Sequence, residues 1–375
     1  MFIKKLKDLK DLKNIGATSF ATSCGKKKGG ILYFEISNLK LSATIILKQE
    51  AISAGGDFIV PKDMILCKDE SYSGILIATH SQIKHIINKC ATQPFNLKHL
   101  SQILQSHIKM ESHSSNNHQI MGIINITNDS FYEDSRINQI DTFITKVRDM
   151  IECGVEIIDI GAASSRPGSE YVESSIEIAK LKKPLSILKS EGLIDKAIFS
   201  IDSYNYDTAR FCVDFGFKII NDVYGLKDMR LANLAIDSKN KIILMHNSFI
   251  NPHNGDIIQN VDEFFNKRLD SLFSLGLKKE QIILDIGFGF GKNTKENVDL
   301  IKYLEHFKHF GCEILVGASR KRSIGEITQK DTKDRLFGTL SLHQIALDRG
   351  ANIIRCHDYK EHIDMLKIWQ KINKD

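Results

Sequence analysis

The chain has 375 residues, more than one hydrophobic core usually holds, so one barrel of about 250 residues plus a smaller domain is the simplest division. Hydrophobic residues make up 42% and charged residues 26%, which is ordinary for a globular protein, so a disordered chain is not expected. The net charge of +5 is small and lacks the dense basic stripe of a nucleic-acid binder, so no nucleic-acid partner is expected. No run reaches about 18 apolar residues, so no membrane partner is expected either.

The beginning of the chain, MFIKKLKDLKDLKN, has lysines in every apolar run and so lacks the hydrophobic region of a signal peptide. The seven cysteines form no C-x-x-C pair and fall mostly within expected core elements. We therefore expect a cytoplasmic protein.

Residues 1–110 mix basic segments with strand candidates at 31–36 and 75–78 and helix candidates at 45–54, 81–90 and 97–104. The run 111–118 is polar and lacks periodicity, which is typical of a linker. We therefore expect a small accessory α/β domain with its linker over 1–118 and the main domain over 119–375. His113 and His118 could bind a metal, but solvated histidines are the simpler interpretation in a polar linker.

Beyond the linker, eight short apolar runs each end in polar residues, and glycine precedes several of them at the expected end of a helix. This pattern predicts an α/β fold in which eight parallel strands alternate with helices and close into a (β/α)8 TIM barrel, with a doubly wound open sheet as the alternative. Reactive groups of such a barrel gather at the carboxyl ends of its strands. These ends lie at 122–125, 157–159, 199–202, 219–222, 244–246, 283–285, 316–319 and 353–357.

Three of these ends carry acids and an amide, namely Asp202, Asn221 with Asp222, and Asp285. Burying them together is unfavourable unless they meet donors, and a flat heterocycle with N–H and amino groups would supply these. Lys321 is the natural cationic partner of this set. The alternative is that each acid caps the helix that follows it.

Arg355 and His357 end the last run on the same side, and with Arg166 they could hold a diphosphate. A structural pair between an arginine and an aspartate is the rival interpretation. Asn125, at the end of the first run, offers a neutral oxygen to a hard cation. The segment 287–292 alternates glycine with phenylalanine and indicates a flexible turn that presents an aromatic face.

Taken together, the motifs resemble the dihydropteroate synthase family, the pterin-binding barrel enzymes of folate biosynthesis. The resemblance covers about residues 120–375 in the family's order and rests on MGIINITNDSF, IIDIGAASSRPGSE, FSIDSY, IINDVYG, ILMH, IILDIGFGFGK, ILVGASRKRSIG and GANIIRCHD. It implies a transferase that condenses 6-hydroxymethyl-7,8-dihydropterin diphosphate with 4-aminobenzoate, with Mg²⁺ as cofactor. It also implies a homodimer, since family members commonly pair through barrel helices.

The matching motif positions imply roles for individual residues. The pterin ring would be held by Asp202, Asn221, Asp285 and Lys321, the diphosphate by Ser165, Arg355 and His357, and Mg²⁺ by Asn125. Two loops, 127–136 and 162–169, would build the aminobenzoate site, which Phe131, Arg166, Pro167, Phe290 and Lys321 would border. Catalysis would involve Asp129, Arg166 and Lys321.

The chain departs from the family pattern at Asn128, Ala163, Ile286 and Arg322, mainly on loops beside the strand ends. Arg322 could pair with the aminobenzoate carboxylate or point to solvent. Two alternatives remain. A pterin-barrel methyltetrahydrofolate methyltransferase would need the acids but no diphosphate site, and a catalytically silent pterin-binding protein would bind pterin without turnover.

Overall fold

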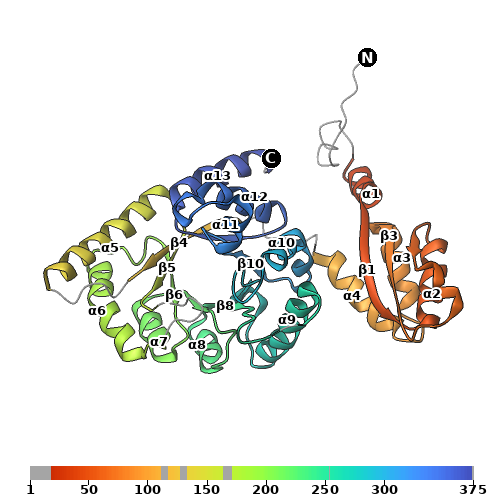
Figure 1. Cartoon of the computed structure of the whole chain (residues 1–375), viewed down its shortest axis with the longest axis horizontal. Coiled ribbons are helices and arrows are strands. Elements are labelled where there is room, and N and C mark those ends of the chain that lie inside the picture. The colour runs from red at the N-terminus through yellow and green to blue at the C-terminus, as the bar shows by residue number, and fades with distance from the viewer. Residues whose placement is uncertain (1–17, 111–116, 127–132, 164–170, 253, 374–375) are drawn as a thin grey trace, which may run out of the picture. The chain divides into compact units, whose positions relative to one another are not determined.

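The computed structural model describes residues 18–110, 117–126, 133–163, 171–252 and 254–373. The chain divides into two compact units, Met1–Ser112 and His113–Asp375, within the polar run that the sequence predicts as the linker (Figure 1).

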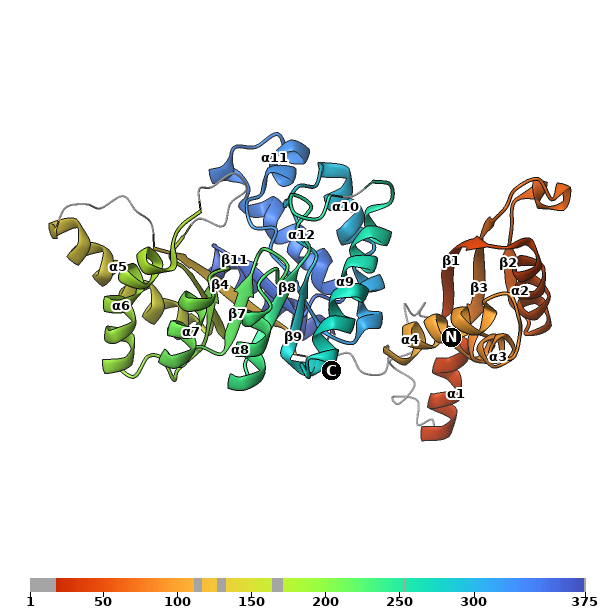
Figure 2. The ribbon, with the colours of Figure 1, turned by 90° about the horizontal axis from the view of Figure 1, so that it is seen from below.

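The N-terminal unit is a three-stranded antiparallel sheet in the order β1-β3-β2 with helices packed on it (Figure 2). Burial alternates along β3, so one face of the sheet packs against helices through Phe58, Leu76, Leu47 and Ile83. The predicted strands and helices of this unit are confirmed. Its elements are α1 (Ser19–Gly29), β1 (Ile31–Leu39), α2 (Leu41–Ser53), β2 (Asp57–Ile59), η2 (Lys62–Leu66), β3 (Tyr72–Thr79), α3 (His80–Cys90) and α4 (Leu97–Met110).

The second unit is a closed barrel of eight parallel strands in the order β10-β11-β4-β5-β6-β7-β8-β9. The predicted (β/α)8 barrel is therefore confirmed, and the open sheet is excluded. The strands are β4 (Gln119–Asn125), β5 (Ile157–Gly161), β6 (Ile198–Asp202), β7 (Ile219–Asp222), β8 (Lys241–Met245), β9 (Ile282–Asp285), β10 (Glu313–Val316) and β11 (Ile353–Cys356).

Helices surround the barrel and cover the outward-facing side chains of the strands (Figure 1). Gly216 and Gly311 follow two of them in the left-handed conformation, as the sequence predicts for helix ends. The elements are α5 (Glu133–Cys153), α6 (Ser174–Ser190), α7 (Tyr206–Phe215), α8 (Arg230–Ser238), α9 (Ile257–Ser274), η3 (Lys279–Gln281), α10 (Thr294–Lys302), η4 (Leu304–Phe310), α11 (Arg322–Thr328), η5 (Thr332–Asp334), α12 (Leu336–Asp348) and α13 (Tyr359–Asn373).

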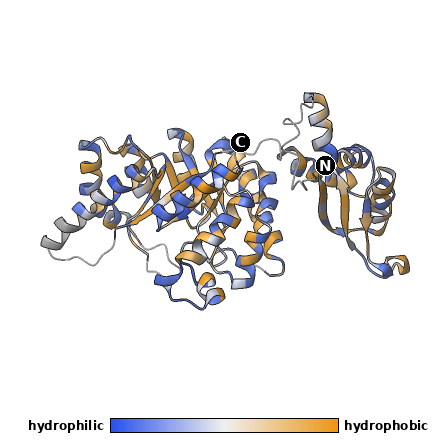
Figure 3. Ribbon diagram, turned by 90° about the horizontal axis from the view of Figure 1, so that it is seen from above, coloured by the Kyte–Doolittle hydropathy of each residue, from blue (hydrophilic) through white to orange (hydrophobic). Residues whose placement is uncertain are grey.

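The barrel strands are buried on both faces, which explains their nearly continuous apolar sequences (Figure 3). Side chains directed outward join the main core beneath the helices. A separate inner layer fills the barrel and consists of Met121, Ile157, Ile219, Ile243, Ile283, Leu315 and Ile353. Because this layer is apolar, polar chemistry is confined to the strand positions beyond it. No helix in the described ranges combines the length and apolar character that a bilayer crossing requires.

Candidate active site

Strand register brings the polar strand ends together above the apolar layer. Asp202 on β6 is level with Gly161 on β5 and with Asn221 on β7. Because side chains alternate along a strand, residues level with one another project to the same side of the sheet. The acids and amide that the sequence predicts to converge are thus neighbours at one end of the barrel.

Arg355 crosses this end of the barrel and joins two buried carboxylates. Its guanidinium lies 2.6 Å from Asp159 and 2.7 Å from Asp202, whose side chains are 0% and 4% exposed. Despite desolvation, these two carboxylates raise the pKa of Arg355 above its usual value. Asp202 therefore forms its ion pair with Arg355. The prediction that Lys321 would be the cationic partner of the acids is wrong for Asp202.

Asp159 is a member of the cluster to which the sequence assigned no role, although it ends the second apolar run. The Asn221 side-chain amide donates to its Oδ2 at 3.1 Å. Its Oδ1 is buried, and no described residue hydrogen-bonds to it. A buried acceptor in this state requires a donor from a ligand or from water.

Asp285 and Asp222 both stand at the ends of strands but differ in how many backbone hydrogen bonds they accept. Asp285 accepts from the Gly287 N–H at 2.7 Å, and burial raises its pKa. Asp222 instead accepts from the backbone N–H groups of Tyr224 and Leu226 at 2.8 and 2.7 Å, and burial raises its pKa to about 6. Asp222 therefore stabilises the turn after β7 and does not cap α8, which begins at Arg230 and has no side-chain cap.

Lys321 lies on the segment after β10, between the Phe290 ring and the acids Asp202 and Asp285. These acids stand on the rim of the barrel, the edge formed by the carboxyl ends of its strands. Its amino group donates to the Phe288 carbonyl and lies 4.5 Å from the centroid of the Phe290 ring. Desolvation lowers its pKa to about 8, even though the Asp285 and Asp202 charges act to raise it. A lysine with this pKa carries a charge at neutral pH that is incompletely compensated by the protein.

The glycine-rich segment 287–292 forms a turn that presents the Phe290 ring to Lys321, in line with the aromatic face that the sequence predicts. Lys292 is buried and donates to the carbonyls of His246 at 3.0 Å, Gly287 at 2.9 Å and Phe290 at 3.4 Å. Gly289 has φ +83°, and a Cβ there would lie 2.9 Å from Lys321 Cδ. Glycine is needed at this position for close packing of the segment on Lys321.

His357 lies beside Ser319, across the gap between β11 and β10. Its ring Nδ1 is 3.0 Å from Ser319 Oγ, and its backbone N–H donates to the same oxygen at 3.3 Å. Partial desolvation and the neighbouring Arg355 cation lower the pKa of His357 to about 4, so the ring is neutral at neutral pH. When the hydroxyl donates to Nδ1, Nε2 carries the proton and can donate to an anion.

A chain of buried histidines links the segments after β10 and β11. The Ala318 N–H donates to His343 Nε2 at 3.0 Å, and His343 Nδ1 lies 2.8 Å from His362 Nε2. His362 Nδ1 in turn lies 2.5 Å from the Asp358 carbonyl oxygen. His343 Nε2 accepts from the Ala318 N–H, so the proton of that ring is on Nδ1 and is donated to His362 Nε2. The proton of His362 is then on Nδ1 and is donated to the Asp358 carbonyl, so both rings are neutral.

Asn125 offers its amide oxygen at the exposed end of β4. The oxygen lies 3.1 Å from the position that a Cβ on Gly161 would take, so the absent side chain leaves room beside it. A neutral oxygen at an open rim suits Mg²⁺, which keeps several waters and adds phosphate oxygens. The residues present therefore fit the predicted ion.

Five predicted site residues lie outside the described residues, namely Asp129, Phe131, Ser165, Arg166 and Pro167. Asn128 and His113 do as well. Among the other departures from the family pattern, Ile286 is part of the core. Arg322 is 90% exposed and pairs with Glu326 at 2.5 Å, so it points to solvent. His118 packs against the Trp369 ring at 4.5 Å.

Comparisons with known proteins agree with this geometry. A family model described as pterin binding enzyme matches residues 121–357. The bifunctional dihydropteroate synthase/dihydropteroate reductase of Helicobacter pylori is 44% identical over 100% of both chains. The chain belongs to the dihydropteroate synthase family. Membership makes it a transferase of folate biosynthesis and favours the synthase over the methyltransferase alternative.

Solved structures of the family superpose on the barrel. A dihydropteroate synthase from Clostridium difficile, determined in the presence of pteroic acid, has a TM-score of 0.65 and 33% identity. It covers 69% of this chain and 98% of its own. The Xanthomonas albilineans synthase with 4-aminobenzoic acid has a TM-score of 0.64 and 31% identity over 69% of this chain and 94% of its own. Of the proteins named here, the Helicobacter relative also aligns along the N-terminal unit.

Proposed function

We propose that the chain condenses 6-hydroxymethyl-7,8-dihydropterin diphosphate with 4-aminobenzoate to give 7,8-dihydropteroate and diphosphate. The observation that carries the proposal is the buried cluster of Asp159, Asp202 and Asn221 next to Lys321 and Arg355. It combines acceptors for a flat ring with cations for an anion, and Asp159 Oδ1 has no donor among the described residues. The titles of the solved relatives, which name pteroic acid and 4-aminobenzoic acid, support the same substrates.

In this proposal the acids and amide position the pterin ring. Asp202 and Asp285 accept hydrogen bonds from its ring N–H and amino groups, while Asn221 can both donate and accept. Lys321 donates to a ring nitrogen or carbonyl from its position over the Phe290 ring. These contacts hold the reactive methylene at the rim, where the diphosphate meets the cations.

The rim cations stabilise the leaving group. Arg355 and the Nε2 proton of His357 bind the diphosphate, and Ser165 would add a hydroxyl to the same anion. Mg²⁺, held by Asn125 and by diphosphate oxygens, would neutralise further charge on the leaving group. The carbon–oxygen bond breaks with its electron pair passing to diphosphate, and the arylamine nitrogen then forms the new carbon–nitrogen bond and loses a proton.

The 4-aminobenzoate would bind beside the pterin ring, next to Phe290. Phe290 borders the pterin position from the segment after β9, beneath Lys321. Phe131, Arg166 and Pro167 would complete the site, with Asp129 and Arg166 as the further catalytic residues.

Diphosphate release is the decisive assay. Purified chain with both substrates and Mg²⁺ should release diphosphate and form dihydropteroate, whereas omission of 4-aminobenzoate should abolish the product. Arg322→Met, at an exposed position, serves as the control and should retain activity. Folded protein that binds the pterin substrate by calorimetry but releases no diphosphate would instead be a catalytically silent pterin-binding protein.

A homodimer is part of the proposal. Large apolar side chains are exposed on α12, where Phe337 is 80% exposed, and directly after α10, where Tyr303 is 48% exposed. Exposed apolar surface on neighbouring helices is typical of a protein interface. Light scattering should give twice the mass of one chain, and Phe337→Glu should shift the protein toward a monomer.

A cytoplasmic location also remains a proposal. All seven cysteines of the chain are free, and Cys90, Cys212 and Cys356 are buried. Unpaired cysteines are typical of a reducing compartment.

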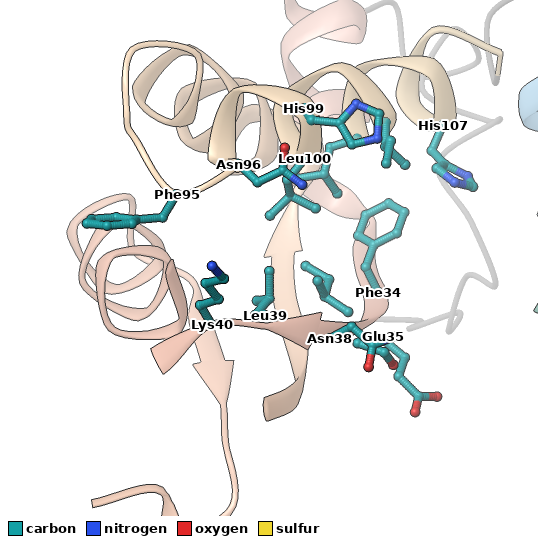
Figure 4. Close-up of a pocket in the computed structure, with 14 residues that line it drawn as sticks. Phe34, Glu35, Asn38, Leu39, Lys40, Phe95, Asn96, His99, Leu100 and His107 are labelled. Atoms are coloured by element: carbon teal, nitrogen blue, oxygen red, sulfur yellow. The ribbon is translucent and has the colours of Figure 1, made fainter. Parts of the chain in front are cut away.

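A second candidate function is reduction of dihydropteroate, favoured by alignment of the bifunctional Helicobacter relative over the entire chain. The N-terminal unit contains a cavity of about 590 Å³, a size that small molecules fill. Phe34, His99 and His107 lie around it (Figure 4). Reduction requires a hydride donor such as reduced nicotinamide or reduced flavin.

The two activities can be separated. Leu100 lines the cavity within the N-terminal unit, so Leu100→Trp should fill the cavity and leave the residues of the barrel unchanged. We expect the full chain with dihydropteroate and a hydride donor to form tetrahydropteroate, and the variant to lose this activity while retaining diphosphate release. Absence of reduction with both classes of donor would remove this candidate.

A further inference from the structure

Three side chains in the helical layer around the barrel converge outside the rim site. Asp262 lies on α9, and His306 and His309 lie on η4, the 3₁₀ segment before β10. The Nε2 atoms of His306 and His309 lie 3.0 and 2.6 Å from the same oxygen, Oδ1 of Asp262. We propose that these three residues form a binding site for a divalent transition-metal ion, Zn²⁺ in the first instance.

The spacing of the histidines follows from the local structure. A 3₁₀ helix has three residues per turn, so side chains at positions i and i+3 lie directly above one another. His306 and His309 are three residues apart in such a helix, and their ring centroids are 5.1 Å from each other. Both imidazoles therefore face α9 from the same side.

The donor atoms have nearly the separation that a tetrahedral ion requires. Zinc binds imidazole nitrogen at about 2.0–2.1 Å and carboxylate oxygen at about 2.0–2.2 Å, which places neighbouring donors about 3.3 Å apart. The three atoms of this cluster all lie within 4.8 Å of one another. A shift of less than an ångström would open the shorter contact enough to admit the ion.

The chemistry of the cluster selects the class of ion. In the metal-free state each Nε2–H donates to the shared carboxylate oxygen; in the bound state each ring carries its proton on Nδ1 and coordinates through Nε2. Two imidazoles and one carboxylate favour Zn²⁺, Ni²⁺ or Co²⁺ over Mg²⁺, which prefers oxygen donors. This ion is thus distinct from the Mg²⁺ proposed at Asn125.

The cluster is accessible but rigidly supported. The side chains of His306 and Asp262 are 34% and 22% exposed, so an ion can enter and complete its shell with water. Beneath them, Phe265 on α9 packs edge-to-face on Phe307 and Phe310 of η4, with ring centroids 5.9 and 5.8 Å apart. The aromatic contacts hold α9 and η4 together before the ion binds, which favours affinity because less ordering is needed.

Binding is tested on the full-length chain after removal of metals with a chelator. Zn²⁺ titrated against a chromophoric chelator, with millimolar Mg²⁺ present, should give one tight site per chain. The double variant His306→Gln with His309→Gln should weaken this site by on the order of 100-fold or more, since losing a direct ligand exceeds the loss caused by a neighbouring contact. His85→Gln removes a histidine from the exposed surface of α3 and should leave the site unchanged.

Two further measurements keep the test decisive if the double variant folds poorly. Co²⁺ bound to the wild-type chain should give the visible spectrum of a four-coordinate nitrogen and oxygen site, without the thiolate band that cysteine ligation produces. Zn²⁺ should also raise the Tm of the wild-type chain. No tight Zn²⁺ in the wild type, equal affinity in a folded double variant, or a thiolate band would each overturn the proposal.

Discussion

Replacing Arg355 with methionine should destabilise the barrel strongly, because the change leaves two carboxylates in its interior without their cation. The Arg355 guanidinium lies 2.6 Å from Asp159 and 2.7 Å from Asp202, and all three side chains are at least 80% buried. Removing one partner of a buried ion pair costs about 3–5 kcal/mol. The variant could also avoid the unpaired charge by protonating one aspartate, which at pH 7 costs about 4 kcal/mol. Both routes give the same magnitude for the loss of unfolding free energy.

The pH dependence of this loss identifies its cause. Lowering the pH neutralises carboxylates and so removes the uncompensated negative charge that the variant buries. The deficit relative to wild type is therefore full near neutral pH and shrinks as the pH falls toward about 4. The further change Asp159→Asn should restore part of the stability at pH 7, since it removes one of the unpaired charges.

Urea denaturation followed by tryptophan fluorescence measures the barrel selectively. The chain has a single tryptophan, Trp369, which lies buried on α13. The matched control is Arg322→Met, where an exposed pair with Glu326 is lost and the expected change is below about 1 kcal/mol. A loss below about 1 kcal/mol for Arg355→Met, or a larger loss that does not change with pH, would refute the buried-pair reasoning.

The other predictions concern Lys321 and the histidine chain. Lys321→Met should abolish diphosphate release yet raise the Tm at pH 7. The reason is that the wild-type lysine has a folded pKa of about 8, below the usual 10.5, so burying its charge costs stability. The stability that the variant gains over wild type is therefore full below pH 8 and is lost as the pH rises toward 10.5. A lower Tm in this variant would contradict the assignment. In the wild-type chain, kcat/KM for the pterin substrate should fall as the pH rises through about 8, since a charged Lys321 is required; a flat profile up to pH 10 would oppose that role. His343→Phe should leave the buried Ala318 N–H unpaired, lower the unfolding free energy by about 1–3 kcal/mol and raise KM for the pterin substrate, and an unchanged KM would mean that the chain of histidines does not position the rim.

Local patterns in the sequence were sufficient to predict the barrel. The alternation of apolar runs with helices ending at glycine depends only on residues a few positions apart, and such patterns determine which segments are strands and which are helices. The strand ends then identify the rim, because parallel strands direct their carboxyl ends to the same side. The strand ends seen in the sequence accordingly include Asp202, Asn221, Asp285 and Arg355.

Pairings between residues far apart in the chain were decided by the tertiary structure. Arg355 meets Asp159, which is separated from it by 196 positions, and this contact exists only because the barrel closes β11 against β4. Asp222 and Asp202 occupy similar strand ends, yet one caps a turn and the other joins the rim, because side chains alternate between the two faces of a strand.

The histidine pair at the proposed metal site shows the same division. Their spacing in the sequence is that of neighbours on a 3₁₀ turn, but only the packing of η4 on α9 brings Asp262 to both rings. The sequence by itself thus determined the elements, the barrel and the rim on which its chemistry is arranged. The tertiary structure decided which charges meet, because ion pairs and metal sites depend on distances of a few ångströms that local sequence patterns do not encode.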